Sequence, residues 1–178
     1  MLICQRKKDY ILAQKLKWFD INRKSKLSFQ GERLYEISEI GYKYHLNDIA
    51  STIGLENLKI IKKKIRYINN IAKTYDKNFS NLKDIKILDK KKDRNSTNWL
   101  YTILVKNRNA FYNYMEKNNI PVSLVHRRID KYKVFGGITK NLKNQEYFDK
   151  YHICLPIHEQ LSNTQIAKIV EKVKKFKS

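Results

Sequence analysis

The feature that most constrains the fold is a long apolar stripe in the first half of the chain. Upstream of the stripe, Asn47 and Asp48 supply an N-cap and a first-turn carboxylate for the start of a long helix. The spacing of the stripe residues, in steps of 4, 3, 4, 3 and 4, is that of one face of an α-helix. We therefore expect a long helix that begins near residue 47 and packs this face in a core or a dimer. The stripe consists of Ile61, Ile65, Ile68, Ala72, Tyr75 and Phe79.

The residues before this helix predict little regular structure. Residues 2–4 are a short apolar strand candidate, and a mixed apolar and basic pattern predicts a helix that ends near residue 19. Residues 20–46 are polar and contain the breakers Gly31 and Gly41, so we expect a long loop there.

The residues after the long helix predict a small α/β unit. A charged connector over 80–98 precedes a run rich in aromatic and β-branched residues, which is typical of a buried strand. Ser162 and Gln165 form a capping-box pattern ahead of the last helix. The expected elements are strands at 99–105, 122–125 and 152–155 and helices at 108–117 and from 163 to the end.

Composition excludes several protein classes. The 178 residues contain no apolar run long enough to span a membrane, and the N-terminal pattern is the reverse of a signal peptide. We expect a cytoplasmic protein with no membrane partner. Cys4 and Cys154 are far apart in the sequence and outside any CxxC pair, so we expect reduced, buried thiols and no metal site.

The net charge of +21 suggests a nucleic-acid partner. However, 30 of the 38 basic residues are lysines, and they are scattered along the chain. Proteins that read bases or clamp phosphates favour arginine for its two-point geometry. Solvated surface lysines are therefore the favoured interpretation, and nucleic-acid binding is kept as an alternative.

Two short segments are suited to anions. Residues 41–45, Gly-Tyr-Lys-Tyr-His, lie just before the N-terminus of the long helix, where backbone amides favour phosphate. Residues 126–128, His-Arg-Arg, place three polar donors at the end of a predicted strand. Exposed loops with incidental charge explain both segments equally well, and the residues alone identify no catalytic group.

Four segments together resemble the DegT/DnrJ/StrS aminotransferases. Residues 39–55 (EIGYKYHLNDIASTIGL) are similar to that family's Gly-Tyr-Asn-Tyr-Arg segment and the helix start after it. The other three segments follow the family's order: residues 13–23 (AQKLKWFDINR), residues 119–122 (NIPV) and residues 155–162 (LPIHEQLS).

The resemblance implies an α/β fold, namely the C-terminal small domain of a fold-type-I pyridoxal-phosphate (PLP) enzyme with the last strand and helix of the large domain. Residues 1–46 would end the large domain and form a loop that crosses the dimer. Residues 47–98 would be the connecting helix and linker, and residues 99–178 the small domain.

The resemblance also implies a function in amino-sugar and surface polysaccharide biosynthesis. Family members are homodimers that transfer an amino group from glutamate to a keto-sugar nucleotide. Their Schiff-base lysine precedes the region matched here, so we expect it in a missing N-terminal half and expect this fragment to be inactive alone. No residue of the chain is predicted to be catalytic.

Site residues carried over from the family fall on two segments. Lys43 stands where the family has the asparagine that binds the PLP phosphate. His45 replaces an arginine and would bind substrate. His126 matches a strand-end histidine near the substrate, and Arg127 replaces the tyrosine after it. A non-catalytic binding module is a further alternative, because transamination needs the absent lysine.

Overall fold

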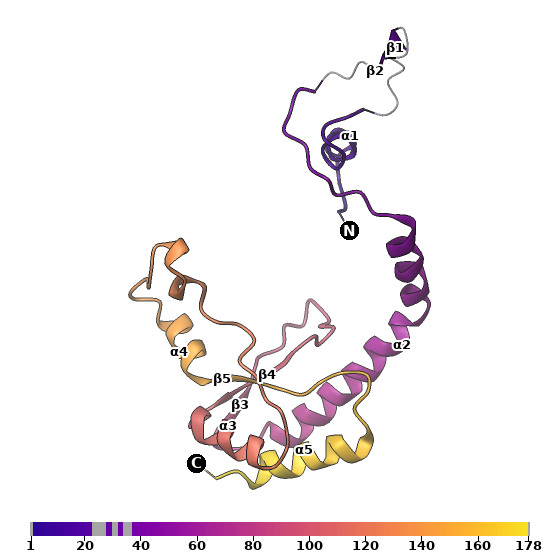
Figure 1. Cartoon of the computed structure of the whole chain (residues 1–178). Coiled ribbons are helices and arrows are strands. Elements are labelled where there is room, and N and C mark those ends of the chain that lie inside the picture. Colours follow the sequence, from indigo (N-terminus) through magenta and orange to yellow (C-terminus); the bar gives the residue numbers. More distant parts are fainter. Residues whose placement is uncertain (1, 23–27, 30–31, 34–36, 178) are drawn as a thin grey trace. The chain divides into compact units, whose positions relative to one another are not determined.

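A computed structural model describes residues 2–22, 28–29, 32–33 and 37–177 (Figure 1). The chain forms two compact units, Met1–Lys59 and Ile60–Ser178, and each is described by itself. The fold is mixed α/β with a small sheet, which confirms the predicted fold class. The three predicted domain boundaries stay predictions.

The first unit contains helix α1 (Lys7–Leu16) and a two-stranded hairpin of β1 (Ser28–Phe29) and β2 (Glu32–Arg33). The predicted helix is confirmed, although it is shorter than expected. The long loop predicted over 20–46 contains this hairpin, and Gly31 lies outside the described residues.

The strand predicted at residues 2–4 is wrong for this structure. These residues belong to no strand, and Leu2 and Ile3 are 76% and 78% exposed. A strand needs a neighbour for its backbone N–H and C=O groups. No described strand pairs with residues 2–4.

The predicted long helix is α2 (Asp48–Phe79). The side-chain oxygen of Asn47 accepts a hydrogen bond from the Ala50 amide at 2.8 Å, which confirms the N-cap. The buried part of the stripe is its C-terminal portion, where Ala72, Tyr75 and Phe79 face the core of the second unit together with the neighbouring Ile71.

The sheet of the second unit is antiparallel and has the order β3-β4-β5. Its strands are β3 (Ile85–Ile87), β4 (Tyr101–Val105) and β5 (His152–Leu155). The central strand β4 pairs Ile103 with Ile87 on one side and with Ile153 on the other. Both predicted strands at 99–105 and 152–155 are therefore confirmed.

Three α-helices and two 3-10 turns follow β4 in the chain. Ser162 and Gln165 cap the last helix reciprocally, because the Gln165 amide donates to Ser162 Oγ at 3.2 Å and the Ser162 amide to Gln165 Oε1 at 2.8 Å. This confirms the predicted capping box. The elements are α3 (Arg108–Lys117), η1 (Ile129–Lys131), η2 (Lys133–Phe135), α4 (Lys143–Tyr151) and α5 (Asn163–Lys175).

One core joins the sheet to α2, α3 and α5. In Figure 1 the yellow helix α5 runs alongside the C-terminal half of α2. The Tyr75 ring stacks on Phe79 at 5.4 Å and meets Tyr101 edge-on at 4.9 Å. The Tyr75 hydroxyl donates to the Pro156 carbonyl at 2.9 Å, so this buried polar group has a partner.

Two local predictions need correction, and one helix was not predicted. Residues 122–125 form no strand, because only Ser123 pairs, in a single bridge to Cys154. The connector predicted over 80–98 contains β3, and the stretch before residue 152 contains α4. The strand β3 forms by pairing with the distant strand β4, which local propensity does not encode.

Cys154 is buried as predicted, whereas Cys4 is only half-buried, and both are free thiols. No helix in the described ranges is both long enough and apolar enough to cross a bilayer.

Candidate functional site

The segment that carries Lys43 is paired with the end of α1. The Tyr42 amide donates to the Leu16 carbonyl at 2.7 Å, and the Tyr44 amide to the Lys17 carbonyl at 2.9 Å. The Phe19 amide donates to the Tyr42 carbonyl at 3.2 Å, and together with the Tyr44–Lys17 bond it makes an antiparallel bridge between Trp18 and Lys43. The backbone on both sides of Lys43 is therefore fixed.

Gly41 allows the two segments to approach this closely. A Cβ atom at Gly41 would lie 2.2 Å from the Asp20 nitrogen and 2.3 Å from the Phe19 carbonyl carbon. Both are backbone atoms, which cannot move aside as a flexible side chain can. Only glycine fits at this position.

Lys43 and His45 lie on one side of the paired segment. Side chains alternate along extended backbone, so Lys43 and His45 point away from Tyr42 and Tyr44. The two tyrosine rings stack on each other at 5.3 Å. Lys43 and His45 are exposed, and neither has an ion pair with any described acidic residue.

His45 borders a small cavity beside α1. Its ring meets Trp18 edge-on at 5.1 Å. The cavity measures about 290 Å³, which is near the lower limit for a small-molecule site. Its lining combines apolar, cationic and amide side chains: Tyr10, Ile11, Gln14, Lys15, Lys17, Trp18, Ile21, Asn22 and His45.

His126 and Arg127 lie together in the second unit. The His126 ring meets Trp99 edge-on at 6.0 Å, and the Arg127 guanidinium lies 5.1 Å from the centre of the Tyr132 ring. Both residues line an open hollow of about 1100 Å³. This volume lies at the upper end of the range of small-molecule sites.

The hollow is shaped by an ion pair that the sequence did not reveal. Arg128 Nε and Nη2 donate to the two carboxylate oxygens of Asp130 at 2.7 and 2.8 Å, and both residues are buried. The Thr139 amide donates to Asp130, and Arg128 donates to the Thr139 carbonyl. The Arg128 hydrogen bonds hold the pKa of Asp130 below its usual range.

The structure thus groups the four predicted site residues as two pairs. Lys43 and His45 lie together in Met1–Lys59, and His126 and Arg127 lie together in Ile60–Ser178. Sequence reasoning missed Asp20 and Asp130. The partners of Asp20 lie 18 and 19 residues later in the chain, and Asp130 belongs to no recognised motif although Arg128 is only two residues away.

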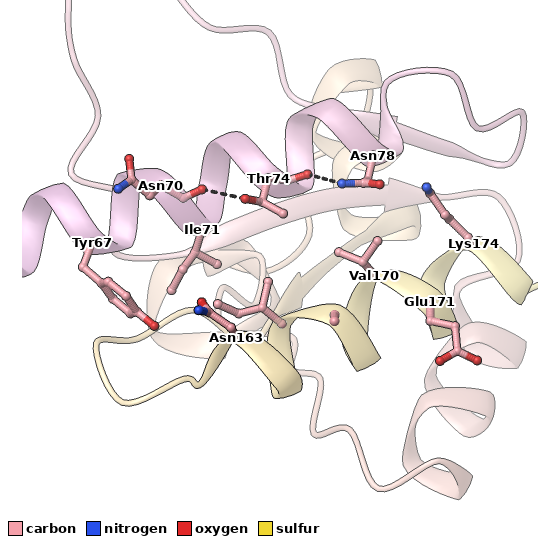
Figure 2. A pocket seen from close by; sticks show the side chains of 11 residues that line it. Tyr67, Asn70, Ile71, Thr74, Asn78, Asn163, Val170, Glu171 and Lys174 are labelled. Carbon is pink, nitrogen blue, oxygen red and sulfur yellow. Dashed lines mark hydrogen bonds between the residues drawn. The ribbon is translucent and has the colours of Figure 1, made fainter.

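A further hollow, between α2 and α5, does not have the character of the predicted site (Figure 2). It measures about 680 Å³ and contains only one acid, Glu171, and one base, Lys174. The Thr74 hydroxyl and the Asn78 amide donate to carbonyls of their own helix, at 3.0 and 2.8 Å. In the same described ranges, no three His, Cys, Asp or Glu side chains gather closely enough to hold a metal ion.

Comparison with known proteins finds relatives that match most of this chain. The chain is 32% identical over 163 residues to a UDP-4-amino-4,6-dideoxy-N-acetyl-beta-L-altrosamine transaminase from Campylobacter jejuni, a match that covers 79% of this chain and 41% of that protein. It is 31% identical over 161 residues to the uncharacterized protein MJ1066 of Methanocaldococcus jannaschii, which covers 85% of this chain and 42% of that protein. The chain therefore spans about two fifths of the length of these relatives.

A solved structure has a fold similar to that of this chain. AtS13 from Actinomadura melliaura superposes with a TM-score of 0.87 at 24% identity, over 95% of this chain and 44% of that one. The sequence profile of one family matches residues 7–174, which include all four predicted site residues. With this match over nearly its whole length, the chain belongs to the DegT/DnrJ/EryC1/StrS aminotransferase family.

Proposed function

We propose that this chain is the C-terminal part of a PLP-dependent aminotransferase that acts on a keto-sugar nucleotide. The observation that carries the proposal is the family match over residues 7–174. The transaminase from Campylobacter jejuni, whose name specifies a UDP-linked amino sugar, supports this class of substrate.

Lys43 fits a role in binding the cofactor phosphate. Its backbone is held by the flanking hydrogen bonds from Tyr42 and Tyr44, while its exposed ammonium group has no described acidic partner. A cation fixed at its base and free at its tip suits an anion. When bound, PLP supplies the electron sink for transfer of the amino group.

His45, His126 and Arg127 are proposed to bind the substrate. Arg127 keeps its charge at any physiological pH and offers a planar fork to a phosphate or carboxylate. Its guanidinium packs on Tyr132, which limits the orientations it must give up on binding. Family resemblance suggests that a second subunit brings the two pairs to one site.

The lysine that binds the cofactor covalently is proposed to lie outside this chain, in an N-terminal half. The coverage of about two fifths of the relatives' length supports this arrangement. In the proposed dimer, this chain binds and orients the cofactor phosphate and the substrate, and the other half carries out the proton transfers.

Co-expression with the N-terminal half tests the proposal. The region of DNA upstream of this chain should encode that half, and the reconstituted enzyme should bind PLP with the absorbance of a lysine adduct. Lys43→Ala should weaken PLP binding at least tenfold, as the loss of a charged hydrogen bond predicts, and Lys43→Arg should restore most of it. Lys91→Ala, which removes an exposed lysine of the 88–98 segment, is the matched control.

An unchanged PLP affinity in Lys43→Ala would remove the phosphate role. If no lysine adduct forms even with the N-terminal half present, the binding-module alternative is favoured. The net charge of +21 favours a third candidate, nucleic-acid binding. That candidate requires salt-dependent retention on DNA, and an absence of retention at low ionic strength would exclude it.

A further inference from the structure

Asp20 is a buried acid at an unusual backbone turn. Its relative exposure is 0%, although it directly follows Phe19 in a short connection after α1. Both residues have positive φ, 56° for Phe19 and 60° for Asp20. Non-glycine residues seldom adopt this left-handed conformation, and aspartate is one of the few that tolerate it.

The Asp20 carboxylate joins α1 to the start of the Lys43 segment. Its Oδ2 accepts hydrogen bonds from the Ser38 and Glu39 amides, both at 2.9 Å, and from the Ser38 hydroxyl at 3.2 Å. Its Oδ1 lies 3.4 Å from Lys15 Nζ in α1. The Ser38 amide bond has the largest part in holding the pKa of Asp20 below its usual range, so the group stays ionised.

These contacts lie immediately before the functional residues. Ser38 and Glu39 are held by the carboxylate, and two residues further on Gly41 packs against the backbone of Asp20. The bridge between Trp18 and Lys43 follows directly. One carboxylate therefore fixes the entry to the strand-like segment, and the paired amides fix the rest.

We infer that Asp20 is a positioning residue, whose carboxylate holds residues 38–45 so that Lys43 and His45 face an anionic ligand from one side. The identity of that ligand, the PLP phosphate, rests on the proposed function. The effect on the conformation of residues 38–45 does not depend on it.

Two substitutions distinguish the effect of the Asp20 carboxylate from the effect of the left-handed turn. Asp20→Gly suits the left-handed backbone better than aspartate does, but it removes the acceptor for Ser38 and Glu39. Asp20→Asn tolerates the same backbone and keeps one oxygen that can accept from these amides, while it loses the ion pair with Lys15. If the turn alone mattered, Asp20→Gly would leave the segment as ordered as before.

The first measurement is amide hydrogen exchange in the chain itself, read by NMR at Tyr42 and Tyr44, whose amides donate to Leu16 and Lys17. Because hydrogen bonds to a charged group contribute about 1.5–3 kcal/mol, exchange should accelerate about tenfold or more in Asp20→Gly. It should change much less in Asp20→Asn. The amides of β4 in the second unit are the internal reference and should not change.

Two results would overturn the inference. One is unchanged exchange at Tyr42 and Tyr44 in Asp20→Gly. The other is an equal loss of protection throughout α1 in both variants, which would show that Asp20 only supports general packing of the first unit.

The second measurement is PLP affinity in the reconstituted dimer, by fluorescence titration. Asp20→Gly should raise the Kd for PLP several-fold, although residue 20 is not proposed to contact the cofactor. Asp20→Asn should restore most of the affinity. If exchange accelerates while the Kd is unchanged, the positioning of the segment stands and the ligand assigned to it is wrong. If Lys43→Ala weakens PLP binding but neither Asp20 variant alters exchange, the proposed function stands and the inference fails.

Discussion

Arg128 and Asp130 form a two-point ion pair, with N–O distances of 2.7 and 2.8 Å, within the wall of the hollow that His126 and Arg127 line. They are only two residues apart, and both also bond the backbone of Thr139, nine residues after Asp130. The pair thus connects the two ends of the 128–139 segment, and it holds the residues next to the proposed substrate site.

Removing one member of this pair should lower the Tm of the second unit more than removing both members does. Asp130→Ala leaves the Arg128 guanidinium buried with only the Thr139 carbonyl as acceptor, so the Tm of the second unit should fall. Arg128→Met combined with Asp130→Ala removes both charges and should recover part of that loss. Thermal denaturation of the natural chain, the two single variants Arg128→Met and Asp130→Ala, and the double variant forms a double-mutant cycle that measures the coupling. Additive effects would show that the pair contributes nothing as a pair.

The same pair predicts a pH dependence. Arg128 lowers the pKa of Asp130 in the folded chain below its unfolded value, so the ionised group stabilises the fold at any pH above the unfolded pKa of about 4. This stabilisation is lost as the pH falls through the lower, folded pKa. The Tm difference between the natural chain and Asp130→Asn should therefore be constant near neutral pH and shrink as the pH is lowered below about 4. Other carboxylates titrate in the same range, and taking the difference between the two proteins cancels them. A gap that widened on acidification would contradict the assignment.

Two glycines make a matched pair of tests. Gly41→Ala places a Cβ 2.2 Å from the Asp20 nitrogen, so the segments should separate and the amides of Tyr42 and Tyr44 should exchange faster. Gly54→Ala, inside α2, meets nothing within 4 Å and should stabilise that helix by up to about 1 kcal/mol. Amide exchange by NMR checks both. Unchanged exchange in Gly41→Ala would show that the contact between the two segments is not as close as described.

The cap of α5 offers a test of local stability. Ser162→Ala removes the acceptor of the Gln165 amide and should lower the free energy of unfolding by about 1 kcal/mol. Ser162→Gly should cost only a few tenths of that, because glycine at an N-cap leaves the amides open to water. Urea denaturation measures both variants. No measurable cost for Ser162→Ala would indicate that the side-chain bond does not stabilise the cap.

Local patterns predicted α2 and α5 well because the signals of these helices are local. The stripe that ends at Tyr75 and Phe79 marked α2, and the pair Ser162 and Gln165 marked the start of α5. Each signal lies within a few residues of the element it defines. The same is true of Tyr101–Val105, whose aromatic and β-branched content marked a strand.

The missed features depend on contacts between distant residues. Ile85–Ile87 lies in a charged connector and becomes a strand only by pairing with β4. Asp20 has no neighbour in sequence that marks it as buried, because its partners Ser38 and Glu39 come 18 and 19 residues later. The family resemblance located Lys43, but it gave no account of what holds that residue in place.

The N-terminal half of α2 predicts that the chain associates when it is alone. Ile49, Ile53 and Ile60 lie on one face of the helix and are 76%, 59% and 46% exposed. Contiguous apolar surface of this kind is covered in stable assemblies, by another part of the protein or by a second copy. We expect the chain to elute as dimers or larger species, with a size that depends on concentration, in size-exclusion chromatography with light scattering. Ile53→Lys should shift it toward monomer, whereas Leu58→Lys, which adds the same charge on the opposite face of the helix, should shift it less. A monodisperse monomer across the accessible concentrations would show that this face needs no partner, and it would weaken the proposal that an N-terminal half or a second subunit completes the enzyme.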